Sequence, residues 1–229
     1  MTGRLFLTIL VLIAVSSVGT FLLRTRFISE TELPEPEIAE SHDSESAEES
    51  GTEGRPSVVP AGYAEPLPRA TERVTKKPFG VYIMPSDSPV QLERFAGYHT
   101  GTDFEVFPDE EDADVVVLAI CTGELLSKRT ASGYGGVLVQ SCEYEGDPIT
   151  VLYGHMRLSS VEDAVGDEVV AGELLGVLGA GYSADTDGER KHLHLGIHRG
   201  TDVNILGYVA SERELSGWID PCVLLCPEP

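Results

Sequence analysis

The sequence predicts an all-β fold, a compact and twisted antiparallel sheet with a groove, for the part of the chain that begins near residue 74. Two observations predict it: short aliphatic and β-branched runs alternate with glycines, and few stretches repeat apolar residues at the helical period. The chain has 229 residues, of which 41% are hydrophobic, so a sizeable core can form. A transmembrane helix and a disordered linker are predicted to precede this domain.

Residues 1–26 are predicted to be a membrane segment. Residues 5–23 contain no charged side chain, and Arg4 and Arg24 flank them. A helix of about 19 residues, at ~1.5 Å rise per residue, spans roughly the ~30 Å hydrocarbon core of a bilayer. We expect an uncleaved anchor. The alternative is a cleaved signal peptide, for which residues 14–17 would be a poor cleavage site.

Residues 27–73 are predicted to be a disordered linker. They are rich in glutamate, serine and proline, a composition that buries too little apolar surface to offset chain entropy. The linker would hold the folded domain, residues 74–229, away from the membrane. We expect this domain to lie outside the cytoplasm, in the periplasm or at the cell surface, or to be secreted if the first segment is cleaved.

Four apolar runs are the clearest predicted strands, and one short stretch favours a helical turn. The runs are residues 115–121, 136–142, 149–153 and 174–178. The helical turn is expected at residues 211–216.

The four cysteines fit two disulfides, although the sequence does not fix their pairing. Cys121 and Cys142 end two apolar runs. If these runs pair antiparallel about a turn near Ala131, the two cysteines lie close enough to bond in an oxidising compartment. Cys222 and Cys226 could close a second, small loop. Buried free thiols are the alternative.

The net charge of −22 excludes nucleic acid as a partner, because a polyanion would be repelled. It also disfavours an anionic membrane surface, so membrane contact is expected only through the N-terminal helix. Acidic residues are dense in residues 30–53 and continue through the folded part, as is typical of a solvated surface. A cationic partner or a saline habitat is the alternative interpretation. Nothing in the sequence indicates an oligomeric state.

Three short fragments hold four of the six histidines and one aspartate. They are His-Thr-Gly-Thr-Asp from His99 to Asp103, Tyr-Gly-His ending at His155, and His-Leu-His from His192 to His194. Residues two apart on a strand share a face, so the last two imidazoles point to one surface while the leucines beside them face the core. Each fragment alone is more often structural, but together they indicate a site.

The first fragment can supply metal ligands. Gly101 and two threonines disfavour a helix between His99 and Asp103, and the alternation after Asp103 predicts a strand, on which positions four apart share a face. Gly101 would also let the chain approach a metal closely. Histidine and aspartate are ordinary zinc ligands, and three ligands with one open position make a catalytic zinc site.

With these fragments the chain resembles the lysostaphin/LytM-like zinc metallopeptidases, whose β domain is of the duplicated-hybrid-motif type. The resemblance extends to Gly-Tyr-Gly-Gly-Val at residues 133–137, the strand-turn-strand pattern of residues 165–179 and Ile-Asp-Pro at residues 219–221. It covers roughly residues 78–225. It implies a zinc-dependent endopeptidase, with one Zn²⁺ per domain, that hydrolyses peptide cross-links of bacterial peptidoglycan.

The resemblance also implies residue roles. His99, Asp103 and His194 would bind zinc, while His155 and His192 would be catalytic without binding it. Zinc would activate water and polarise the scissile carbonyl, and a histidine would take the proton and return one to the leaving amine. Which histidine is the base stays open. The alternatives are a non-catalytic member that binds wall or activates another hydrolase, and a structural β domain with incidental histidines.

Residues 181–191 depart from the family pattern, which has a small turn and a proline before its His-x-His. Here the segment is longer and charged, with a lysine immediately before the histidine pair. The departure affects the shape and charge of the substrate groove rather than the metal site. Asp185 or Asp187 could orient a ligand imidazole, or both could belong to a solvated acidic loop. Whether residues 74–98 cover the groove as an inhibitory segment also stays open.

Overall fold

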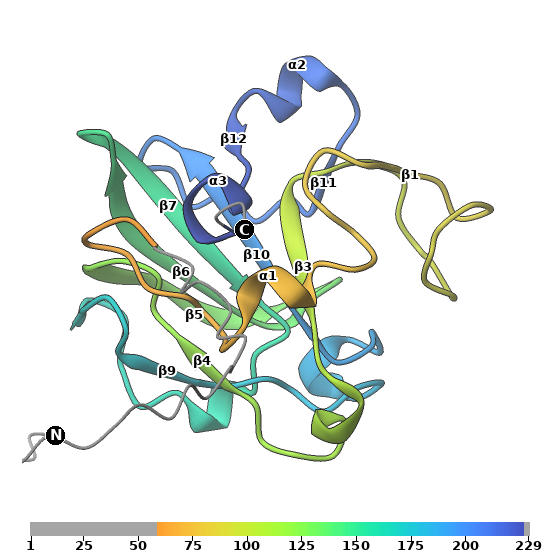
Figure 1. The fold of residues 1–229 in the computed structure, drawn as a ribbon, viewed down its shortest axis with the longest axis horizontal. Coiled ribbons are helices and arrows are strands. Elements are labelled where there is room, and N and C mark those ends of the chain that lie inside the picture. Colours follow the sequence, from red (N-terminus) through yellow and green to blue (C-terminus); the bar gives the residue numbers. More distant parts are fainter. Residues whose placement is uncertain (1–58, 227–229) are drawn as a thin grey trace, which may run out of the picture. The chain divides into compact units, whose positions relative to one another are not determined.

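The computed structural model describes residues 59–226, which form a mostly β domain (Figure 1). The predicted membrane segment, residues 1–26, and the predicted linker as far as residue 58 lie outside this range. Within residues 59–226 no helix is long and apolar enough to cross a membrane.

The regular elements are short strands joined by turns, with a few single helical turns. The strands are β1 (Tyr82–Ile83), β2 (Gly97–His99), β3 (Gly101–Glu105), β4 (Val116–Leu118), β5 (Gly123–Ala131), β6 (Gly135–Tyr144), β7 (Asp147–Gly154), β8 (Glu168–Val169), β9 (Leu174–Val177), β10 (His192–Arg199), β11 (Tyr208–Val209) and β12 (Trp218–Ile219). The α-helices are α1 (Ala70–Arg73), α2 (Glu212–Leu215) and α3 (Cys222–Leu225), and 3-10 turns occupy Pro108–Glu110, Leu158–Ser160 and Ala184–Thr186.

The main sheet has seven strands among the described residues. Its order is β12-β10-β7-β6-β5-β8, and β3 also pairs with β10. One edge of β10 bonds β7, while the other edge is shared by β3 in its first half and β12 in its second. Two smaller sheets, β1-β2-β11 and β4-β9, complete the domain, and every strand pair is antiparallel. The predicted antiparallel fold is therefore confirmed.

Strand β10 places its leucines in the core, as its alternation predicts. Leu193, Leu195 and Ile197 are fully buried in the main core cluster, together with Phe104 and Tyr153. The histidines at alternate positions therefore face the opposite side of the sheet. The expected helical turn is also present, as α2, and Ser211 caps it by accepting a hydrogen bond from the backbone of Glu214.

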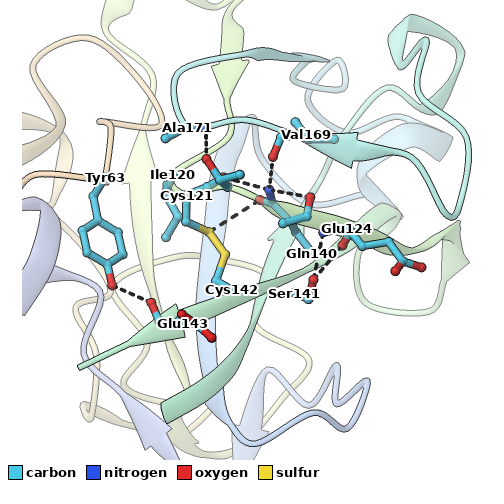
Figure 2. Close-up of a disulfide and its surroundings, with 12 residues drawn as sticks. Tyr63, Ile120, Cys121, Glu124, Gln140, Ser141, Cys142, Glu143, Val169 and Ala171 are labelled. Carbon is cyan, nitrogen blue, oxygen red and sulfur yellow. Dashed lines mark hydrogen bonds between the residues drawn. A yellow bond between two sulfur atoms is a disulfide. The ribbon is translucent and has the colours of Figure 1, made fainter. Parts of the chain in front are cut away.

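Both cysteine pairs form disulfides in the structure, Cys121–Cys142 (Figure 2) and Cys222–Cys226. The strand that pairs with β6 differs from the expectation, however. It is β5, which begins two residues after Cys121, whereas the run that ends at Cys121 forms β4 and pairs with β9. Beside the first disulfide, the buried Gln140 donates a hydrogen bond to the carbonyl of Cys121 and accepts one from Tyr153, each 2.8 Å long.

The predicted linker ended at residue 73, but residues 59–73 pack on the domain. Leu67 and Ala70 are fully buried in the main core cluster. Arg73 donates two hydrogen bonds to the carboxylate of Glu110, 2.6 and 2.8 Å long. The phenol of Tyr63 donates to the carbonyl of Glu143 (Figure 2). Because these few apolar and charged anchors outweigh the proline-rich composition, the folded part begins well before residue 74.

Candidate active site

The three predicted ligands meet at one point. Nε2 of His99 lies 3.0 Å from Nδ1 of His194 and 3.2 Å from Oδ1 of Asp103, and the last two atoms are 3.1 Å apart. The register of β3 and β10 sets Asp103 directly opposite His194, and β2 ends at His99, two residues before β3 begins. The three atoms form a nearly equilateral triangle that could hold a metal ion.

The hydrogen bonds around this triangle fit a cation. Nδ1 of His99 lies 3.2 Å from the carbonyl of Pro78, which can only accept, so this nitrogen carries the proton and Nε2 presents a lone pair. Nε2 and the Asp103 oxygen are thus two buried acceptors with no hydrogen to share, an arrangement that a cation stabilises. Ligand atoms about 2.0 to 2.2 Å from a tetrahedral zinc lie about 3.3 to 3.6 Å from one another. The triangle therefore needs only a small expansion to take the ion.

Gly101 is required here by packing rather than by a turn. A Cβ atom at this position would lie 2.4 Å from the carbonyl oxygen of Leu195 and 2.7 Å from Nε2 of His194. The missing side chain lets β3 pair closely with β10 and leaves room for the His194 ring next to Gly101.

The two remaining histidines lie side by side next to the triangle. The ring centroids of His155 and His192 are 4.2 Å apart. Nδ1 of His192 donates to the carbonyl of Arg190 at 2.9 Å, so in the neutral ring Nε2 carries a lone pair, which lies 3.3 Å from Oδ2 of Asp103. His155 follows β7 with a left-handed backbone, φ 65°, and its buried Nδ1 has no hydrogen-bond partner in residues 59–226.

Burial sets the charge of these groups. It lowers the pKa of His155 well below its usual value and that of His194 to about 4, so both rings are neutral near pH 7. Burial alone would raise the pKa of Asp103, but the electrostatic effect of the neighbouring His192 and His99 rings and the hydrogen bond with His194 hold it well below its usual range. A carboxylate and neutral imidazoles are the forms that bind metals.

Two charged residues of the site were not foreseen from the sequence, Arg190 and Glu105. Nη2 of Arg190 donates to Oδ2 of Asp103 at 2.8 Å, and its Nε donates to both Glu105 oxygens at 3.1 and 2.9 Å. Strand parity could have placed Glu105 on the face of Asp103, since the two are two apart in β3. No local pattern pairs either with an arginine 85 or more positions later.

A cavity of about 370 Å³ opens over these groups. The rings of Phe95, Tyr134 and Tyr208 line it together with the four histidines of the site. The ring of Tyr134 lies 5.3 Å from that of His194 and 5.5 Å from that of His155, and its buried hydroxyl has no partner among the described residues.

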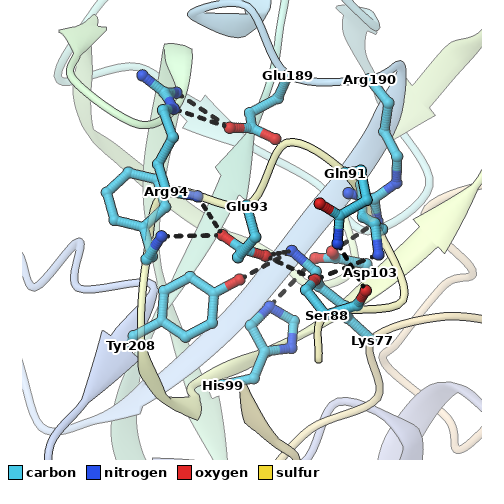
Figure 3. A network of polar contacts seen from close by, with 12 residues as sticks. Lys77, Ser88, Gln91, Glu93, Arg94, His99, Asp103, Glu189, Arg190 and Tyr208 are labelled. Carbon is cyan, nitrogen blue, oxygen red and sulfur yellow. Dashed lines mark hydrogen bonds and ion pairs between the residues drawn. The ribbon is translucent and has the colours of Figure 1, made fainter. Parts of the chain in front are cut away.

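The loop between β1 and β2 lies at this cavity (Figure 3). The Glu93 carboxylate accepts hydrogen bonds from the ammonium of Lys77 and from the hydroxyl of Ser88. The next residue, Arg94, reaches across to Asp187 and Glu189 with hydrogen bonds of 2.9 to 3.2 Å. Part of residues 74–98 therefore does line the groove.

The charged segment before β10 turns out to be mostly structural. Lys191 points its ammonium at the backbone carbonyls of Glu110 and two neighbours, not into the cavity. Asp187 accepts from the backbone of Gly133 at 2.7 Å and from Arg94. Among the described residues neither Asp185 nor Asp187 bonds an imidazole, so the idea that one orients a ligand histidine is wrong.

Comparison with known proteins finds a protein-family match that covers most of the described domain. The model of Peptidase family M23 matches residues 97–205, a range that contains all five predicted site residues. No curated protein matches the chain.

Two solved structures illustrate the similarity. One is cbpa from L. salivarius REN, 21% identical, with 72% of this chain and 94% of that one covered at a TM-score of 0.47. The other is the catalytic domain of the antimicrobial peptidase lysostaphin from Staphylococcus simulans, 22% identical, with 67% and 92% covered at a TM-score of 0.44. The predicted family is confirmed by the family match: residues 97–205 form a domain of peptidase family M23.

Proposed function

We propose that this domain is a zinc-dependent endopeptidase that hydrolyses peptide cross-links of bacterial peptidoglycan. The observation that carries the proposal is the triangle of His99, Asp103 and His194 at the cavity, with two further histidines beside it. The peptidase family of residues 97–205 supports the reaction class. The three triangle residues would hold one Zn²⁺, leaving a position open for the reaction.

The chain's own residues then divide the proton transfers. Zinc, when bound, would act as a Lewis acid: it would polarise the scissile carbonyl and lower the pKa of water, so that water can attack near neutral pH. His192 is the better placed base, because its Nδ1 proton is held by a backbone carbonyl and Nε2 is bare. Once protonated, Nε2 lies 3.3 Å from Oδ2 of Asp103, which stabilises the imidazolium.

His155 has the complementary role. Its Nδ1 is buried and unpartnered in residues 59–226, so it can donate a hydrogen bond to the developing oxyanion or a proton to the leaving amine. The left-handed backbone that aims this ring costs on the order of 1 kcal/mol or more, as is common at functional positions.

The setting of the domain is part of the proposal. Residues 1–26 would anchor it, as a membrane helix, outside the cytoplasm, where peptidoglycan lies. The two disulfides support an oxidising compartment.

Zinc stoichiometry combined with digestion of purified cell wall tests the proposal. We expect one zinc per domain and release of soluble muropeptides by the loaded protein. A domain that stays metal-free would contradict it. A zinc-bound domain that releases no peptide product would instead favour a non-catalytic member that binds wall or activates another hydrolase.

A further inference from the structure

The residue two positions before the histidine pair is an arginine that reaches the centre of the site. Arg190 is 6% exposed, and its Nη2 donates to Oδ2 of Asp103 at 2.8 Å. Figure 3 shows its side chain running toward Asp103. The other oxygen of that carboxylate, Oδ1, faces His99 and His194. The two oxygens therefore have different partners: Oδ2 bonds the cationic guanidinium, and Oδ1 faces the two histidines of the triangle.

A second carboxylate fixes the arginine in place. Glu105 accepts from Nε of Arg190 with both oxygens, at 3.1 and 2.9 Å, and also from Nη2. The register of β3 and β10 sets Glu105 opposite His192. Because the guanidinium is planar and bonds both carboxylates from one side, it can rotate away from Asp103 only by breaking its bonds to Glu105.

The backbone of the same residue orients a catalytic candidate. The carbonyl of Arg190 accepts the Nδ1 proton of His192 at 2.9 Å, which leaves Nε2 of that ring bare. Side chain and backbone of Arg190 thus act on two different members of the site.

We propose that Arg190 is a positioning residue that makes Asp103 a one-oxygen ligand. With Oδ2 held by the guanidinium, only Oδ1 is offered to the metal, and a coordination position stays open for the reaction. Without Arg190, Oδ2 is free to turn toward the metal and fill that position. The inference rests on the proposed metal site, but it concerns how Asp103 binds rather than which bond is cut.

Metal binding without any substrate tests this role. Arg190→Met combined with Glu105→Met removes the guanidinium together with the carboxylate that fixes it, so Asp103 is the buried carboxylate that loses its cation, and thermal unfolding of the apo protein measures that cost separately from metal binding. We expect the Zn²⁺ affinity, measured by competition with a chromophoric chelator, to fall about 10- to 100-fold. The visible absorption of bound Co²⁺ should weaken, because five-coordinate Co²⁺ absorbs less than tetrahedral Co²⁺.

Two further variants serve as a second test of Arg190 and as a control. Arg190→Lys keeps the charge but cannot bond both carboxylates with one rigid fork, so its Co²⁺ spectrum should shift in the same direction even if the double variant folds poorly. Lys191→Met removes the adjacent buried cation, which bonds backbone carbonyls outside the cavity, and should lower stability while leaving the Co²⁺ spectrum unchanged.

Parental Zn²⁺ affinity and an unaltered Co²⁺ spectrum in the folded Arg190 variants would overturn the positioning role. A parent protein that binds no metal would overturn both this inference and the proposed function. A parent that binds zinc but cuts no peptide would count against the function alone, and the spectra would still decide the role of Arg190.

Discussion

Histidines on one face of β10 have different surroundings, and these separate their roles. His194 and His192 both face Asp103, whereas His198 packs its ring on Trp218 with centroids 4.9 Å apart, outside the cavity. His155 reaches the site from the end of β7 and makes no bond to the triangle. Residue type alone does not distinguish a ligand from a proton carrier; the atom each ring presents does.

His155→Ala tests this division. The variant should keep one zinc, because His155 is not part of the triangle, and should lose at least about 100-fold in kcat, the usual effect of removing an acid–base group. Metal content by mass spectrometry and muropeptide release measure the two effects. His198→Ala, from the same face of β10, should keep both zinc and activity. Loss of zinc from the His155 variant would show that His155 is a metal ligand and not a catalytic residue outside the triangle.

Among the elements, the close contact of β3 with β10 builds the site. Gly101→Ala forces a Cβ atom within 2.7 Å of the His194 ring, so we expect unfolding free energy to fall by about 1–3 kcal/mol and zinc affinity to fall with it. Denaturant unfolding and chelator competition measure these changes. Gly217→Ala, whose nearest contact would be 3.3 Å, is the matched control and should change affinity little. Parental zinc affinity in Gly101→Ala would show that this contact does not shape the triangle.

Helix α1 is held to the 3-10 turn Pro108–Glu110 by a charge pair with a definite pH dependence. Hydrogen bonds from Arg73 lower the pKa of Glu110 from 4.5 to about 2, so the stabilisation is complete above about pH 4.5 and is lost as the pH falls toward 2. Because the carboxylate is partly solvated, we expect Glu110→Gln to cost only about 1–2 kcal/mol at pH 6.

Denaturant unfolding of the parent and of Glu110→Gln between pH 2 and 7 checks this. The difference in unfolding free energy should shrink as the pH falls below about 4.5. The neighbouring exposed Glu111, whose side chain makes no ion pair in residues 59–226, provides Glu111→Gln as a control with little effect at any pH. A difference that stays constant across the range would mean that the pair is not what stabilises α1.

Elements with a local apolar pattern could be predicted from the sequence, whereas contacts set by strand pairing could not. The apolar strands and the parity of β10 were predictable, because alternation is a local signal. Strand β5 was not, because much of its length is polar and only partly buried. The pairing of Arg190 with Asp103 and Glu105 depends on the strand register, which no local pattern reveals.

At the scale of the whole molecule, the domain depends on residues 59–73, although their composition is typical of a disordered linker. Residues 59–73 contribute Leu67 and Ala70 to the core and Arg73 to the pair with Glu110. A chain that starts at residue 74 should therefore be at least about 3 kcal/mol less stable than one that starts at residue 59. Leu67→Ala in the longer chain should cost about 2–5 kcal/mol. Equal thermal stability of the two chains would contradict the packing of this segment.

The triangle of His99, Asp103 and His194 is expected to serve peptide hydrolysis. Digestion of chemically defined cross-linked muropeptides, read by mass spectrometry, tests it most directly. We predict one cleaved peptide bond in the cross-link, loss of cleavage after chelation and its return with zinc. Intact muropeptides after incubation with folded, zinc-loaded protein would contradict the account.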